Sequence, residues 1–197
     1  MPVLYYVRHG LTDWNIQQRL QGRQDSTLTA EGVNQAERCA DILRDLFERD
    51  GCRPDDFAYV SSPLGRARKT MELLRSALGI DPSRYAVDPR LAEIAFGAWE
   101  GLTYDDILAR DAGIVAQREN NKWRFKSPGG ESYEEVTVRV AGWHATVTTD
   151  TVAVAHGGTA RALIAHCGIV PPEEATHYSI DQGVVYAFEA SHISKYS

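Results

Sequence analysis

Short apolar runs alternate with amphipathic segments along this chain. The runs are rich in β-branched and aromatic residues, a composition that predicts buried strands. They lie at residues 3–7, 57–60, 85–87, 151–155 and 184–188, the last of these being the final predicted strand. Since the runs are continuous rather than alternating with polar residues, they favour a mostly parallel sheet that is covered on both faces.

Apolar positions at helical spacing predict the helices that lie between these strands. We expect helices over about residues 30–50, 63–79, 133–147 and 158–168. Thr29 is placed to cap the first helix, and Ser62 to cap the second with Pro63 as its first residue. Ser132 and Glu135 have the spacing of a capping box at the start of the third. This alternation predicts an α/β fold.

Length and charge narrow the choice of function. The 197 residues suit a single domain over 1–197, with a cap at most. With 21 basic and 27 acidic residues the net charge is −6, which disfavours binding to nucleic acid or to an anionic membrane. The chain has no apolar run long enough to span a membrane and no apparent signal peptide. Its three cysteines, at 39, 52 and 167, follow no disulfide or metal spacing, so we expect a cytoplasmic protein.

Candidate chemistry lies where the predicted strands end. Arg8 and His9 follow the first strand, Arg66 lies in the first turn of the helix after the second, and His156 follows the strand at 151–155. Ligands of such folds bind beyond the carboxyl ends of the strands. Arginine matches phosphate geometry, and histidine can act as a covalent nucleophile. A phosphate between Arg8 and Arg66, with His9 behind its phosphorus, would make a phosphoryl-transfer site to which a protonated His156 adds positive charge.

The leaving oxygen of such a reaction needs a proton donor. Glu93 stands among apolar neighbours, where desolvation would favour its neutral form, although a surface carboxylate fits the pattern equally well. Two histidines could also bind a metal, but the sequence has no HExxH motif and no clustered Cys or carboxylate ligands, so we expect no metal.

Together these residues resemble the histidine phosphatase superfamily, also called the phosphoglycerate-mutase-like family. The matching segments span nearly the whole chain and occur in the family's order. They are Arg8-His9-Gly10, Thr12 with Trp14-Asn15, Gln21-Gly22, Leu28-Thr29, Ser61-Ser62-Pro63 with Arg66, Glu93, Phe96-Gly97 with Trp99-Glu100-Gly101, Pro128 to Ser132, and Ala155-His156-Gly157-Gly158.

The resemblance implies a three-layer αβα sandwich and a phosphohistidine intermediate on His9, with no metal or other cofactor. It implies that Glu93 is the proton donor. It also implies a phosphate- and substrate-binding set made of Arg8, Thr12, Asn15, Gln21, Gly22, Arg66, His156 and Gly157.

The family contains both mutases and phosphatases, and two features favour a phosphatase. Residues 102–127 are shorter than the basic insertion of the glycolytic mutases, and Leu11 stands where those mutases carry a glutamate. The segments around Phe96 and Pro128 are similar to those of the smaller phosphatases, including the α-ribazole phosphatases. We therefore expect a phosphomonoester hydrolase acting on a small phosphorylated metabolite, either α-ribazole phosphatase-like or of broad specificity.

Two alternatives stay open: a cofactor-dependent phosphoglycerate mutase, and a non-catalytic protein of the same fold that binds a phosphoester or a partner. Residues 102–127 are a candidate cap, in which cations and aromatics alternate from Lys122 to Lys126. The cap could hold a second anionic or aromatic part of the substrate, or it could be a packed loop. The sequence does not indicate an oligomeric state.

Overall fold

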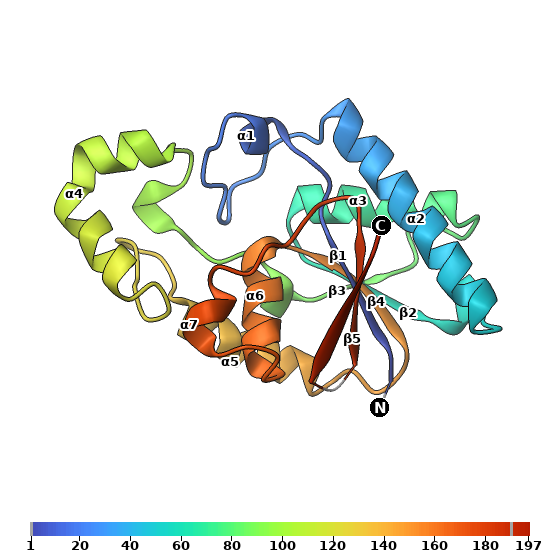
Figure 1. The fold of residues 1–197 in the computed structure, drawn as a ribbon. Coiled ribbons are helices and arrows are strands. Elements are labelled where there is room, and N and C mark those ends of the chain that lie inside the picture. Colours follow the sequence, from blue (N-terminus) through green and yellow to red (C-terminus); the bar gives the residue numbers. More distant parts are fainter. Residues whose placement is uncertain (1, 190) are drawn as a thin grey trace.

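A six-stranded sheet forms the centre of the protein in a computed structural model that describes residues 2–189 and 191–197. The strands are β1 (Leu4–Arg8), β2 (Ala58–Ser61), β3 (Ala86–Val87), β4 (Thr151–Ala155), β5 (Val185–Glu189) and β6 (His192–Tyr196). Their order is β3-β2-β4-β1-β5-β6 (Figure 1). The pairings among β3, β2, β4 and β1 are parallel, whereas β5 pairs antiparallel with both β1 and β6. The sheet is therefore mostly parallel, as predicted.

Helices cover both faces of this sheet. The longer ones are α2 (Ala30–Arg49), α3 (Gly65–Ala77), α4 (Tyr104–Asn120), α5 (Tyr133–His144) and α6 (Gly157–His166), and the short ones are α1 (Asp13–Ile16) and α7 (Pro172–Ala175). Short 3₁₀ turns lie at Pro54–Asp56, Pro89–Leu91 and Gly97–Trp99. No helix in the described part of the chain is long and apolar enough to cross a membrane.

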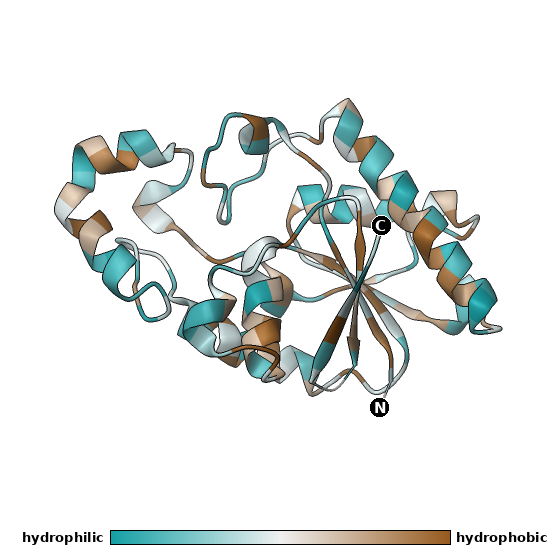
Figure 2. Cartoon of the chain, viewed as in Figure 1, coloured by the Kyte–Doolittle hydropathy of each residue, from teal (hydrophilic) through white to brown (hydrophobic). Residues whose placement is uncertain are grey.

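Alternate residues of the strands supply two separate cores. On β1, Leu4 and Tyr6 pack with α5 and α6, whereas Tyr5 and Val7 pack with α2 and α3. Side chains of neighbouring residues point to opposite faces of a strand, so both faces of β1 are buried. The hydrophobic colour is concentrated on the strands and on parts of the helices in Figure 2. The result is the predicted three-layer arrangement.

Two of the helix caps predicted from the sequence are present in the structure, and one is not. Thr29 caps α2, and Ser132 forms the capping box of α5 with Glu135. The prediction that Ser62 caps α3 is wrong, because α3 begins at Gly65 after Leu64. The Ser62 hydroxyl instead bonds to His156.

The end of the chain and residues 102–127 also differ from the sequence-based description. The run at 184–188 is not the last strand, since β6 follows it and completes an antiparallel hairpin with β5. Residues 102–127 contain α4, which lies to the side of the sheet (Figure 1) and bends at Asp111. A third, smaller core made of Trp99, Ile107 and Val115 holds α4 in place.

Candidate active site

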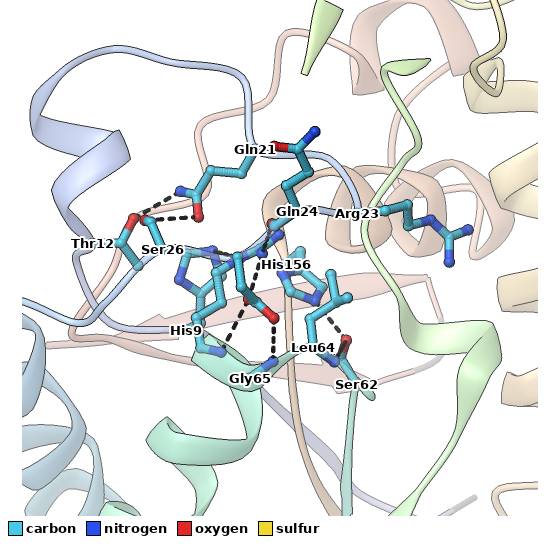
Figure 3. A network of polar contacts seen from close by, with 12 residues as sticks. His9, Thr12, Gln21, Arg23, Gln24, Ser26, Ser62, Leu64, Gly65 and His156 are labelled. Carbon is cyan, nitrogen blue, oxygen red and sulfur yellow. Dashed lines mark hydrogen bonds and ion pairs between the residues drawn. The ribbon is translucent and has the colours of Figure 1, made fainter. Parts of the chain in front are cut away.

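The carboxyl ends of β1 and β4 bring the two candidate histidines together. Arg8 is in register with Ala155 across the parallel pair, so the next residues, His9 and His156, lie side by side. Their ring centroids are 5.2 Å apart. Figure 3 shows the two rings at the centre of a polar network, with Ser62 from the end of β2 beneath His156.

His9 is held as a neutral ring with a defined tautomer. Its Nδ1 lies 2.8 Å from the carbonyl oxygen of Gly10, and a carbonyl can only accept, so Nδ1 carries the proton. The lone pair on Nε2 then accepts a hydrogen bond from Nε of Arg66 at 3.3 Å. Burial, followed by the charges of Arg66 and Arg8, lowers the pKa of His9 well below its usual 6.5. At neutral pH, Nε2 is therefore an available nucleophile.

His156 is fully buried and anchored on two sides. Its Nε2 lies 2.6 Å from the hydroxyl of Ser62, and its backbone N–H donates to the Tyr6 hydroxyl at 3.0 Å. Its Nδ1 is buried with no hydrogen-bond partner among the described residues. Burial, then the charges of Arg66, His9 and Arg8, lowers the pKa of His156 well below 6.5. The free protein therefore disfavours the protonated His156 suggested by the sequence.

Arg66, the second residue of α3, is oriented by backbone carbonyls of the loop that follows Gln21. Its Nη1 donates to Gln24 O at 2.6 Å and its Nη2 to Gly22 O at 2.9 Å. Asp25 pairs with Nη1 at 2.8 Å and also accepts from the backbone N–H of Gly65 at 2.7 Å. The same carboxylate thus orients the guanidinium and caps α3, which has no side-chain cap of its own.

Arg8 carries an unsatisfied donor at the centre of the site. One terminal nitrogen, Nη1, donates to Ile180 O at 2.7 Å, whereas Nε is buried without a partner in the described structure. This Nε lies 3.6 Å from the point that a Cβ on Gly157 would occupy. Buried donors in native proteins are normally paired, so Arg8 Nε calls for an acceptor such as a phosphate oxygen.

Glu93 lies in the segment after β3, and its carboxyl group reaches the start of α6. Its Oε2 accepts from the backbone N–H of Gly158 at 3.1 Å, and its Oε1 accepts from that of Ile94 at 2.8 Å. A Cβ at Gly158 would lie only 2.2 Å from Oε1, so the carboxyl group requires a glycine there. Glu93 is half-buried, and both of its carboxylate oxygens accept backbone N–H bonds, which its apolar sequence neighbours do not predict. The carboxyl group thus lies against Gly158, two positions after His156 in the chain.

The loop residues of the candidate set form a network around Thr12. The fully buried Thr12 hydroxyl accepts from Gln21 Nε2 at 2.8 Å and donates to Asn15 Oδ1 at 3.0 Å (Figure 3 shows the Gln21 contact). Gly22 has a φ of +54°, which favours glycine, and this turn presents its carbonyl to Arg66. Thr12, Asn15 and Gln21 therefore hold this loop together through their own hydrogen bonds.

Two residues of the site have no clear signal in the sequence. Gln182 donates from Nε2 to His9 O at 2.8 Å and to Asn15 Oδ1 at 3.2 Å, joining the strand end to the loop. Asp25 orients Arg66, as described above. Both stand in irregular segments far along the chain from their partners, so neither periodicity nor capping patterns identify them.

Two arginines, a neutral histidine whose Nε2 lone pair accepts from Arg66, and a carboxyl group thus converge at one sheet edge. Such a site can bind a tetrahedral oxyanion and attack its central atom. Among the described residues, no group of three or more His, Cys, Asp or Glu side chains is arranged to hold a metal ion.

Comparisons with known proteins agree with this geometry. One relative is the probable phosphoglycerate mutase GpmB of Salmonella paratyphi C, 36% identical over 140 residues, which are 71% of this chain and 60% of that protein. The chain thus covers less than two thirds of the length of the mutases that it matches.

Two solved structures resemble the whole fold. A putative α-ribazole-5′-P phosphatase from Escherichia coli superposes with a TM-score of 0.80 at 25% identity, covering 98% of this chain and 94% of that one. A mycobacterial glucosyl-3-phosphoglycerate phosphatase in complex with VO3 gives 0.77 at 30% identity, covering 95% and 92%. The family match itself extends over residues 4–195. This chain belongs to the histidine phosphatase superfamily (branch 1).

Proposed function

We propose that this protein is a phosphomonoester hydrolase that works through a phosphohistidine intermediate on His9. The observation that carries the proposal is the tautomer of His9. The proton on Nδ1 is donated to Gly10 O, so Nε2 carries the lone pair. This lone pair faces Arg66, where a phosphate would bind. Both structural neighbours described above carry phosphatase names, which supports hydrolysis.

In the first step, Nε2 of His9 attacks phosphorus and the P–O ester bond breaks. Arg8 and Arg66 stabilise the negative charge of the transferring phosphoryl group. His156, through the unpartnered Nδ1, binds a phosphate oxygen. Protonated Glu93 transfers its proton to the leaving alkoxide, giving an alcohol.

In the second step, water attacks the phosphorus of phosphohistidine and the P–N bond breaks. Glu93, now ionised, accepts a proton from that water. The products are inorganic phosphate and His9 in its starting form. Neither step consumes a cofactor, and we expect the physiological substrate to be a small phosphorylated metabolite.

The direct test is to trap the intermediate. Labelled phosphomonoester mixed with enzyme, quenched without acid and mapped by peptide, should place the label on His9, and His9→Ala should remove both label and turnover. Activity should persist in EDTA and be inhibited by vanadate, which becomes trigonal bipyramidal, like the transition state, when a nucleophile binds to it. An active enzyme that never carries label, or activity that requires a divalent ion, would contradict the mechanism.

A mutase is the second candidate, because the curated relatives carry that name. It would use the same phosphohistidine but return the phosphoryl group to a hydroxyl instead of to water. Incubation with 3-phosphoglycerate and 2,3-bisphosphoglycerate separates the two: a phosphatase releases inorganic phosphate, and a mutase produces 2-phosphoglycerate. A hydrolysis screen that also includes sugar phosphates, nucleotides and α-ribazole phosphate would then rank substrates.

A further inference from the structure

The proposed proton donor, Glu93, lies in a segment that has no regular secondary structure. Residues 93–96 belong to no helix or strand, so no ladder of backbone hydrogen bonds supports them. The carbonyl oxygen of Glu93 accepts from no backbone N–H among the described residues. Segments with few backbone bonds of their own open more easily than helices and strands do. The position of Glu93 therefore depends on side chains from elsewhere in the fold.

Arg139, a half-buried residue of α5, holds this segment through two carbonyl oxygens. Its Nη2 donates to Glu93 O at 3.2 Å, and its Nη1 donates to Arg90 O at 2.5 Å. The same guanidinium makes a bidentate pair with Glu131, from Nε to Oε1 at 3.0 Å and from Nη2 to Oε2 at 3.1 Å. Because the guanidinium is planar and rigid, these bonds fix the two carbonyls relative to α5.

Glu131 holds the other end of the segment. Its Oε2 accepts from the backbone N–H of Ala95 at 2.9 Å, and its own N–H donates to Ala95 O at 2.8 Å. Burial would raise the pKa of Glu131, but the hydrogen bonds from Arg139 and Ala95 lower it, so the group is a carboxylate at neutral pH. Arg139 and Glu131 thus fix the backbone on both sides of the Glu93 side chain.

The same carboxylate also contacts the loop that orients Arg66. Glu131 Oε2 accepts from Arg23 Nη2 at 3.0 Å, and the preceding residue, Gly22, gives its carbonyl to Arg66 Nη2 at 2.9 Å. The network therefore joins the segment of Glu93 to the loop beside the phosphate position. A proton donor must lie within hydrogen-bonding reach of the leaving oxygen, and a misplacement of about 1 Å can lower the rate by ~10²-fold.

We propose that Arg139 and Glu131 are positioning residues, which hold Glu93 where it can protonate the leaving oxygen of a bound phosphomonoester. This inference rests on the proposed phosphatase activity and on the role of Glu93 in it. Arg139 reaches the site only through the backbone of Glu93, so its effect on the reaction passes through that residue. Loss of Arg139 should therefore resemble loss of the acid rather than loss of a phosphate-binding group.

Two esters with different leaving groups test this role. Glycerol 1-phosphate leaves as a basic alkoxide that needs a proton, whereas p-nitrophenyl phosphate leaves as a stabilised phenolate. For both esters kcat/KM reports only the steps up to release of the alcohol, so hydrolysis of phospho-His9 does not enter. We expect Arg139→Gln to lower the ratio of the two kcat/KM values, alkyl over p-nitrophenyl, by about tenfold or more. Arg139→Lys, which keeps the charge without the bidentate geometry, should give an intermediate ratio.

A double-mutant cycle shows whether the effect passes through Glu93. In the Glu93→Gln background no acid is left to position, so adding Arg139→Gln should not change the ratio further. The matched control is Arg44→Gln. Arg44 also pairs with a carboxylate, that of Asp41, and donates to a carbonyl, Ala77 O at 2.7 Å, but it lies on α2 and touches no residue of the site. Its ratio should equal that of the wild type.

The ratio is insensitive to a partial loss of folded enzyme, because both esters report on the same active fraction. Since removing one partner of a half-buried ion pair leaves an uncompensated charge, Arg139→Gln combined with Glu131→Gln is the second variant. It leaves neither charge alone, and we expect the same low ratio from it. A folded Arg139→Gln enzyme with the wild-type ratio, or one that slows both esters equally, would overturn the proposal.

Failure of the proposed function gives a different result, since a protein that cleaves neither ester is not a phosphomonoesterase. Hydrogen exchange at the amide of Gly158 then still tests the positioning. Gly158 is the second residue of α6, so its N–H has no acceptor within the helix and donates to Glu93 Oε2 at 3.1 Å. Arg139→Gln should speed this exchange by about tenfold or more, as Glu93→Ala should, through loss of a hydrogen bond to a charged group. Exchange at the wild-type rate in Arg139→Gln would contradict the proposal, and Arg44→Gln should keep that rate.

Discussion

Arg66 donates a hydrogen bond from Nε to Nε2 of His9, the atom that would attack phosphorus, over 3.3 Å. The contact joins the start of α3 to the end of β1, and it has two effects. It fixes the direction of the His9 lone pair, and its positive charge disfavours protonation of that ring. In the proposed mechanism, the residue that binds phosphate therefore also keeps the nucleophile neutral.

Replacing Arg66 should impair both of these roles. We expect Arg66→Ala to lower kcat/KM for any phosphomonoester by at least about tenfold, because a hydrogen bond to a charged group contributes ~1.5–3 kcal/mol. Steady-state kinetics on purified, folded protein is the measurement. Arg68→Ala is the control, since Arg68 is exposed on the same helix. Equal losses in the two variants would mean that the other face of α3 serves the site.

Removing the acid at Glu93 should give a defect that depends on the leaving group. General acid catalysis contributes ~10²–10⁴-fold, so Glu93→Gln should slow alkyl phosphates by that order. p-Nitrophenolate leaves without a proton, so the initial burst of p-nitrophenol should be nearly spared. The burst is the informative phase, because hydrolysis of phospho-His9 also uses Glu93. The same fold-reduction for both leaving groups would show that Glu93 shapes the site without donating a proton.

Gly158 offers a second way to disturb Glu93. An added Cβ would meet Oε1 at 2.2 Å, so Gly158→Ala should displace the carboxyl group and reproduce the leaving-group dependence of Glu93→Gln. Gly142→Ala is the matched control: its Cβ meets nothing within 4 Å, and alanine in a helix should stabilise the protein by ~0.5–1 kcal/mol. The burst assay and a urea titration measure the two outcomes. Full alkyl phosphatase activity in Gly158→Ala would contradict the placement of Glu93.

The buried histidines should make stability depend on pH. The pKa values of His9 and His156 are lowered in the folded protein, so below pH 6.5 the unfolded chain binds protons that the folded protein does not. The free energy of unfolding should therefore be nearly level between pH 7.5 and 6.5 and fall below pH 6.5, approaching ~1.4 kcal/mol per pH unit for each histidine.

Urea denaturation at pH 7.5, 6.5 and 5.5 measures this slope. His156→Asn should make it shallower, and His177→Asn, which changes an exposed histidine, should leave it as in the wild type. Parallel pH profiles for wild type and His156→Asn would show that His156 titrates normally.

Local patterns in the sequence were sufficient to predict most of the strands and helices. The apolar runs mark five of the six strands in the described sheet, because a strand buried on both faces needs consecutive apolar residues. Thr29 and Ser132 mark two helix starts, because each caps a backbone N–H three residues ahead. β6 carries a weaker signal, because it is an edge strand with exposed and half-buried residues and no continuous apolar run marks it. The Ser62 prediction failed because a tertiary partner, His156, competes for the hydroxyl.

The sequence by itself determined which residues could bind and attack a phosphate, since Arg8, His9, Arg66 and His156 each follow or adjoin a strand end, and parallel strands bring such ends to one edge. Only the tertiary structure decided how these residues are held. The Nε2 lone pair of His9 is directed by Arg66, and the orientation of Arg66 depends on Asp25. These contacts join residues far apart in the chain through single hydrogen bonds, and such bonds produce no periodic pattern in the sequence.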